Sequence, residues 1–155
     1  MPSHSLPGEV PILKATAFID GASRGNPGLA GFGVFMKTER GELIEIAGFL
    51  GTATNNVAEY AGLIEALTMA QQEGANELDI VSDSLLLVNQ MLGKYRVKHP
   101  NLLPLYEKAR RLVRAFDRFS IRHTLRAGNK DADRLANLAI DSGESRLVYR
   151  SHVDS

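Results

Sequence analysis

The N-terminal half of the chain alternates between apolar runs and short groups of turn-forming residues. Apolar and β-branched residues fill positions 14–20, 30–37 and 42–50, which predicts three β-strands. A stretch rich in Gly, Asn and Pro separates the first two runs, and residues 38–41 separate the second from the third. Short links of this kind are typical of hairpins, so we expect consecutive antiparallel strands.

Beyond residue 54 the apolar spacing becomes that of a helix. Apolar residues recur at helical intervals from 55 to 73, with Thr54 and Asn55 as suitable N-caps and Gly74 as a suitable stop. The later pattern predicts a strand at 78–82, helices at 84–92 and 101–116, a strand at 119–125, and a helix at 129–141 capped by Asn129. The order βββαβααβα predicts an α/β fold: a five-stranded mixed sheet, three antiparallel strands then two parallel, flanked by helices.

Composition adds limits on the class of protein. The chain has 155 residues, of which 44% are hydrophobic and 23% charged, its formal net charge is zero, and it has no cysteine. We expect one domain at 12–143, a flexible tail at 1–11 and a C-terminal tail at 144–155. The chain shows no secretory signal and no apolar run of the roughly 20 residues that a membrane helix needs, so a cytoplasmic monomer with no membrane partner is expected.

Four acids fall where this topology brings segments together. Asp20 ends the first strand and Asp83 directly follows the fourth. If these strands are parallel neighbours, both carboxylates emerge at one edge of the sheet. Glu59 and Asp133 lie in the first turns of their helices and border apolar faces. Like charges repel at short range, so a cation is a good reason to gather four carboxylates.

Oxygen donors without cysteine favour Mg²⁺ or Mn²⁺ over zinc. Two such ions about 3.5–4 Å apart can stabilise the attacking and leaving oxygens of a phosphodiester. Taken singly, each acid has a simpler explanation. Asp20 with Gly21 could form a turn, Asp83 could cap a helix, Glu59 could be a surface acid, and Asp133 could answer a helix dipole. The metal hypothesis therefore depends on the four acids taken with the motifs that contain them.

Those motifs are "DGASRGNPG", "TNNVAEYAGLIEAL", "SDS" and "GNKDADRLANLA". In this order and spacing they resemble the type I ribonuclease H family, and the resemblance runs from about residue 14 to about residue 141. It implies a ribonuclease H-like fold and two-metal cleavage of the RNA strand of RNA–DNA hybrids, leaving 5′-phosphate and 3′-hydroxyl ends. The family's four catalytic, metal-binding acids map onto Asp20, Glu59, Asp83 and Asp133. Asp20 would bridge both ions.

The resemblance also implies which residues contact the substrate. These are Asn26, Thr54, Asn55, Asn56, Arg126 and Asn129. Amide side chains both donate and accept hydrogen bonds, which suits a 2′-hydroxyl, the group that distinguishes RNA. For Asn55, simple helix capping is an equal alternative, and both roles can hold.

The chain departs from the best-known bacterial members in its connection after "SDS". Those members carry a Trp-containing basic insertion, whereas this chain has no tryptophan and only "GKYRVKHPN". Basic residues nevertheless gather there and in the next predicted helix, and Glu107 is the only acid in 94–114. The basic residues are Lys94, Arg96, Lys98, Lys108, Arg110, Arg111 and Arg114. They form either a phosphate-binding face or an ordinary solvated one.

Two further departures concern single residues. Those members have a loop histidine before the last helix. Here His123 falls at a matching distance from Asn129, but Arg126 is better placed in the loop, where it could hold a phosphate but not shuttle a proton. Leu85 stands where those members often have a substrate-contacting glutamine. The pattern "R-x-x-N-x-x-x-D", formed by Arg126, Asn129 and Asp133, resembles the branch of the family found in archaea and some bacteria.

Two functions remain at this stage. A ribonuclease H acting on RNA–DNA hybrids, with double-stranded RNA as a further partner, is favoured because all four acids are present. The alternative is a module of the same fold that binds such duplexes without cutting. A dinucleotide-binding loop at "GLAGFG" is excluded, since that stretch leads into a strand rather than a helix N-terminus.

Overall fold

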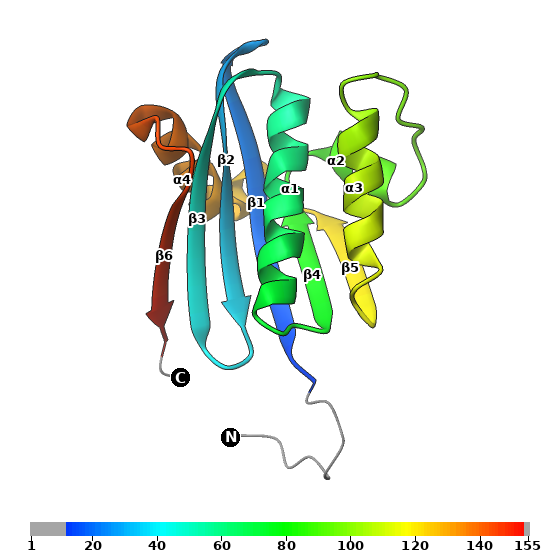
Figure 1. Cartoon of the computed structure of the whole chain (residues 1–155), viewed down its shortest axis with the longest axis vertical. Coiled ribbons are helices and arrows are strands. Elements are labelled where there is room, and N and C mark those ends of the chain that lie inside the picture. The colour runs from blue at the N-terminus through cyan, green and yellow to red at the C-terminus, as the bar shows by residue number, and fades with distance from the viewer. Residues whose placement is uncertain (1–11, 154–155) are drawn as a thin grey trace.

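The computed structural model describes residues 12–153, which form a mixed six-stranded sheet with helices on both faces (Figure 1). The strands are β1 Lys14–Gly25, β2 Gly28–Thr38, β3 Glu42–Ala53, β4 Glu77–Ser82, β5 Arg118–His123 and β6 Leu147–His152. The helices are α1 Asn55–Gln72, α2 Leu85–Met91, α3 Leu103–Val113 and α4 Lys130–Ser142, with a 3-10 turn at Arg126–Gly128. The strand order is β5-β4-β1-β2-β3-β6.

The predicted hairpins are present, and their strands run further than expected. β1 continues to Gly25 and pairs residue by residue with β2, so the Gly/Asn/Pro stretch is mostly strand and only Asn26 and Pro27 lie between the two. Gly25 has a φ of 100°, a backbone conformation that favours glycine. β4 runs parallel to β1 and β5 parallel to β4, as the strand–helix–strand order predicts.

The core lies mainly between the sheet and α1, with α3 packed against α1 on the same side (Figure 1). Side chains alternate between the two faces of each strand, so Ile44 and Ile46 enter this core while Ala47 points to the other face. There Ala47 meets Leu135 and Ala139 of α4. The sheet is therefore held between α1 and α4, the two helices that carry Glu59 and Asp133.

The sixth strand corrects the expectation of five strands and of a C-terminal tail over 147–152. β6 pairs antiparallel with β3 at the edge of the sheet. Arg146, directly before β6, bonds Glu65 of α1 at 2.6 Å, and Arg150 of β6 bonds Glu73, directly after α1, at 2.8 Å. The strand was missed because it is a largely exposed edge, whose side chains need not follow the alternating pattern that reveals a half-buried strand.

No helix within residues 12–153 is long and apolar enough to cross a membrane. The predicted tail at 1–11 lies outside the described residues, as do residues 154–155.

Candidate active site

Three carboxylates meet at the point where the parallel pairing of β1 and β4 ends. Asp20, Glu59 and Asp83 each offer an oxygen, and these oxygens lie within 4.8 Å of one another. The β1–β4 ladder runs through the pair Ile19 and Ser82, so the next residue on each strand is an acid. The parallel pairing thus brings together two residues that lie 63 positions apart in the chain.

Glu59 reaches this edge because α1 packs closely against β1. Thr54 caps the helix, its Oγ1 accepting a hydrogen bond from the Val57 amide at 3.2 Å. A Cβ at Gly21 would collide with the backbone of Ala58 and Glu59. Gly21 lies inside β1 rather than in a turn, so the alternative that Asp20 and Gly21 only form a turn is wrong.

Asp133 approaches from the other face of the sheet. A Cβ at Gly33 of β2 would collide with the backbone of Ala132 and Ala136, so glycine lets α4 lie directly on the sheet. Asp133 lines the same pocket as Asp20, and it contributes to the raised pKa of Asp20. Asp131 lies in the same first turn but is exposed and faces Arg134 at 3.5 Å. The two acids of this turn therefore have different surroundings.

Burial makes the charges of this cluster costly. Asp20 is 6% exposed and Glu59 9% exposed. Burial, followed by the charge of Asp83 and the neighbouring Asp133, raises the pKa of Asp20 to about 8. Burial and the charges of Asp20 and Asp83 raise the pKa of Glu59 well above its usual value.

The donor set fits a divalent cation. Glu59 Oε2 is buried and has no hydrogen-bond partner among residues 12–153. A buried carboxylate oxygen without a donor is unfavourable unless a cation meets it. All the grouped donors are carboxylate oxygens, the ligands of hard ions rather than of zinc–thiolate sites.

A pocket of about 410 Å³ opens over these acids, and Asp83 and Asp133 lie in its wall with Asp20 and Glu59. Of the predicted substrate contacts, Asn55, Asn56 and Arg126 also line it. Asn26 lies beside it, its Oδ1 accepting a hydrogen bond from the Asn55 amide at 3.1 Å. Thr54 serves as the cap described above.

The structure confirms Thr54 as a helix cap and corrects the other capping predictions. Thr54 rather than Asn55 caps α1, so the Asn55 side chain is not used as a cap. Asn129 precedes α4, but its side chain makes no cap hydrogen bond and is buried. Ser84 caps α2 by accepting from the Leu87 amide at 3.2 Å, so Asp83 is not needed there.

The two candidates for the family's loop histidine lie in different places. Arg126 begins the 3-10 turn before α4 and faces the pocket, whereas His123 is the exposed last residue of β5 and is not part of the pocket wall. Leu85 begins α2 and is 53% exposed. The structure therefore favours Arg126 over His123 as the loop residue near the acids.

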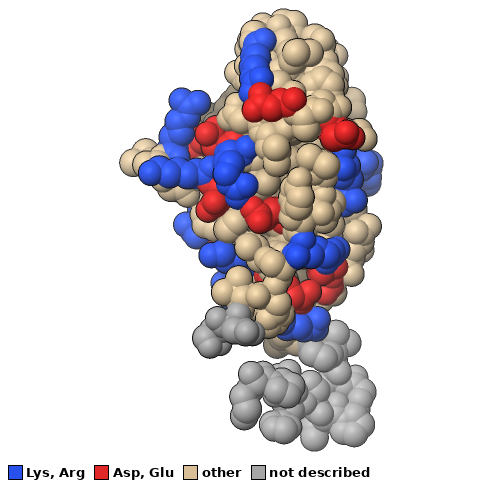
Figure 2. All heavy atoms as spheres, turned by 90° about the vertical axis from the view of Figure 1, so that its left-hand side faces the viewer, with Lys and Arg blue, Asp and Glu red and all other residues tan. Residues whose placement is uncertain are grey.

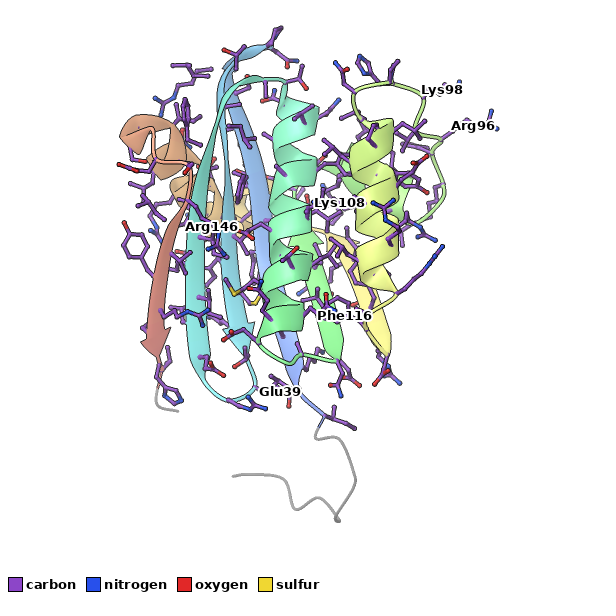
Figure 3. All side chains as sticks on the ribbon, in the orientation of Figure 1. Glu39, Arg96, Lys98, Lys108, Phe116 and Arg146 are labelled. Carbon is purple, nitrogen blue, oxygen red and sulfur yellow. The ribbon has the colours of Figure 1, made fainter. Side chains whose placement is uncertain are left out.

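The charged surface differs from one side of the molecule to the other. Arg96 and Lys98 project from the connection between α2 and α3, and Lys108 lies on α3 (Figure 3). On the side of α4 and β6, positive and negative side chains are mixed (Figure 2). Pairs such as Arg24–Asp141 at 2.7 Å and Arg150–Glu73 at 2.8 Å reduce the net charge there.

Several known proteins are similar to this chain in sequence. A family model described as reverse transcriptase-like matches residues 18–139. A ribonuclease HI of Halobacterium salinarum is 43% identical over 129 residues, which cover 83% of this chain and 65% of the relative. A ribonuclease H of Dichelobacter nodosus is 30% identical over 146 residues, which cover 85% of this chain and 94% of the relative. The chain belongs to the ribonuclease H family.

Solved structures of type 1 ribonucleases H have the same fold. The crystal structure of the H. salinarum enzyme matches with a TM-score of 0.79 at 41% identity and covers 83% of this chain and 98% of that one. LC11-RNase H1, solved in complex with an RNA/DNA hybrid, matches with a TM-score of 0.77 at 38% identity, covering 83% and 98%. The predicted ribonuclease H fold is confirmed.

Another relative is much longer than the matched region. A bifunctional protein of Mycobacterium tuberculosis is 47% identical over 132 residues, which cover 84% of this chain. This chain spans only 36% of that relative's length.

Proposed function

We propose that the chain hydrolyses the RNA strand of RNA–DNA hybrids, leaving 5′-phosphate and 3′-hydroxyl ends. The observation that carries the proposal is the group of three carboxylates, Asp20, Glu59 and Asp83, which meet where the β1–β4 pairing ends. One oxygen of Glu59, on α1, is buried without a hydrogen-bond partner in the described chain. Family membership supports it, as does the relative solved with an RNA/DNA hybrid.

The acids have the positions that a metal-dependent hydrolase needs. Asp20, Glu59, Asp83 and Asp133 would hold two Mg²⁺ or Mn²⁺ ions, which when bound stabilise negative charge on the attacking and leaving oxygens. The Gly21 amide donates to Asp20 Oδ1 at 2.9 Å and fixes the orientation of that carboxylate. The site is therefore organised by the backbone before substrate arrives.

Other residues of the pocket bind and orient the substrate. Asn55 and Asn56 begin α1, are exposed, and offer amide donors and acceptors to the ribose 2′-hydroxyls. Arg126 lines the same pocket, and its guanidinium suits a phosphate. Recognition of the 2′-hydroxyl on one strand selects RNA for cleavage over DNA.

Cleavage of labelled duplexes tests the proposal. RNA–DNA, RNA–RNA and DNA–DNA duplexes are incubated with Mg²⁺, with Mn²⁺ and with chelator. We expect cation-dependent cutting of the RNA strand of the hybrid, and Asp20→Asn abolishes it. Asp79→Asn is the matched control, because Asp79 lies on β4 outside the pocket and pairs with Arg122 at 3.1 Å.

The outcomes separate the two functions. Cutting by Asp20→Asn at the wild-type rate would remove the carboxylates from the mechanism. Tight hybrid binding without cutting under any condition would favour the binding module. The RNA–RNA arm determines whether double-stranded RNA is also a substrate.

A further inference from the structure

Asn129 is a buried amide whose surroundings differ from those of the other predicted substrate contacts. It is 1% exposed, while Asn55 and Asn56 are exposed at the start of α1. It is not part of the pocket wall that Asn55, Asn56 and Arg126 share. A substrate could reach its side chain only if the surrounding chain moved.

The side chain of Asn129 is bonded to the strand that carries Asp20. Its Nδ2 donates to the carbonyl oxygen of Ile19 at 2.8 Å, 110 residues away in the chain. Ile19 and Ser82 form the last pair of the β1–β4 ladder. The amide thus bonds β1 where the strands part, one residue before Asp20.

The backbone of Asn129 is bonded to two more segments of the site. Its carbonyl accepts from the Asp133 amide at 3.1 Å, and its own amide donates to the Arg126 carbonyl at 3.0 Å. Asp133 and Arg126 are therefore each one hydrogen bond from Asn129, and Asp20 lies one residue beyond the bonded Ile19.

We propose that Asn129 is a positioning residue that joins β1 to α4 and thereby sets how closely the carboxylates of Asp20 and Asp133 approach. Two carboxylates repel each other when charged, and this repulsion pushes β1 and α4 apart. A neutral side chain with one donor opposes that movement without adding another charge to the cluster.

Only the donor half of the amide is used. Asn129 Oδ1 is buried and has no hydrogen-bond partner among residues 12–153. An unpaired buried acceptor is unfavourable, so the oxygen does not explain why an amide is there. A leucine of similar size would remove this unpaired oxygen and keep the volume, but would leave the Ile19 carbonyl without its donor.

Asn129→Leu therefore separates the hydrogen bond from packing, and Asn129→Ala serves as a second variant. Ile44→Val is the control for stability, because Ile44 is buried in β3 outside the pocket and the change removes one methyl group. The expected change in kcat rests on the proposed function, whereas the expected change in Mg²⁺ binding does not. Binding of Mg²⁺ provides a readout that needs no cleavage.

The binding readout uses Gly21. Its amide donates to Asp20 Oδ1, so its ¹H–¹⁵N resonance follows the position of that carboxylate during a Mg²⁺ titration. We expect both Asn129 variants to need about tenfold more Mg²⁺ for half-saturation. They should also lower kcat by about 10–100-fold with KM for the hybrid within about twofold of wild type. Ile44→Val should keep the wild-type values.

Two results would overturn the inference. One is Asn129→Leu with wild-type Mg²⁺ binding and kcat. The other is a raised KM at unchanged kcat, which would make Asn129 a substrate contact. If the wild-type chain binds Mg²⁺ but cuts no duplex, the proposed function fails, while a weakened Mg²⁺ response of the Asn129 variants would still support the positioning role.

Discussion

The carboxylate pocket and the basic surface over α2–α3 are both concentrations of one charge, but they are built differently. The acids are buried or half-buried and come from four separate elements. The bases are Lys94, Arg96, Lys98, Lys108, Arg110, Arg111 and Arg114, from one connection and one helix. Holding like charges together in a buried place destabilises a fold, whereas exposed charges cost little. The pocket therefore has the features of a chemical site, whereas the exposed bases suit either a phosphate-binding face or an ordinary solvated one.

Within this comparison, the largest expected effect on activity is that of Glu59→Gln, which tests whether the carboxylate pocket carries out the chemistry. The change keeps the size and polarity of a buried side chain but removes the charge that faces Asp20 and Asp83. We expect kcat on the hybrid to fall at least about 100-fold, or about 2.7 kcal/mol in activation free energy, with KM little changed. Steady-state kinetics on a labelled hybrid check it. A normal kcat would show that Glu59 is not part of the reacting group.

Much of this pocket could be predicted from the sequence. Asp20 and Asp83 directly follow the last paired residues of β1 and β4, and the parallel pairing of those strands fixes their meeting. The helical period placed Glu59 and Asp133 beside packed faces. Why the helices can lie so close to the sheet was not predicted. The reason is that Gly21 and Gly33 have no side chains. Glycine within a strand was the available signal, since it often marks close backbone approach.

Other features were beyond sequence reasoning for physical reasons. Whether Asn129 caps a helix or bonds a distant strand depends on a contact 110 residues away, which local pattern does not contain. β6 is an edge strand held by its pairing with β3 and by ion pairs in and directly before it. Because few of its side chains are buried, its sequence shows no alternating apolar pattern.

The buried acids should also reduce stability when no cation is bound. The pKa of Asp20 is about 8 in the folded chain and 3.8 ordinarily. Between these values the folded state keeps a proton that the unfolded state has lost, so stability falls as pH rises from about 4 to about 8. Asp20→Asn does not titrate and avoids this loss. In chelator we therefore expect it to be more stable than wild type by on the order of 5 kcal/mol at pH 8, about 1.4 kcal/mol for each pH unit above 4, with the difference vanishing near pH 4.

Thermal unfolding from pH 4 to pH 9, with chelator and with Mg²⁺, measures this effect. Mg²⁺ should stabilise the wild-type chain and reduce the difference at pH 8, because bound cation offsets the repulsion. A wild-type chain as stable as Asp20→Asn at pH 8 in chelator would mean that the acids relax apart without cost.

The smallest expected effect belongs to the basic surface. Lys94, Arg96 and Lys98 form no ion pair within residues 12–153, and Arg96 and Lys98 point outward (Figure 3). Changing all three to alanine should raise KM for the hybrid about fivefold, or about 1 kcal/mol, and leave kcat unchanged. It should also reduce the slope of log KM against log salt by up to about 3, since three bases are removed and each lost phosphate contact removes nearly one unit. Arg110 is left intact because it bonds the Met91 carbonyl at 3.2 Å.

The matched control changes Arg134, Arg146 and Arg150, which lose the same three charges but are paired with Glu45, Glu65 and Glu73. Their charges are already balanced locally, so KM and its salt slope should change less than in the α2–α3 variant. An equal loss in both variants would mean that the hybrid responds only to net charge, and the α2–α3 surface would then be an ordinary solvated face. A loss confined to the α2–α3 variant would mean that the phosphates contact this surface, with binding there and chemistry in the pocket.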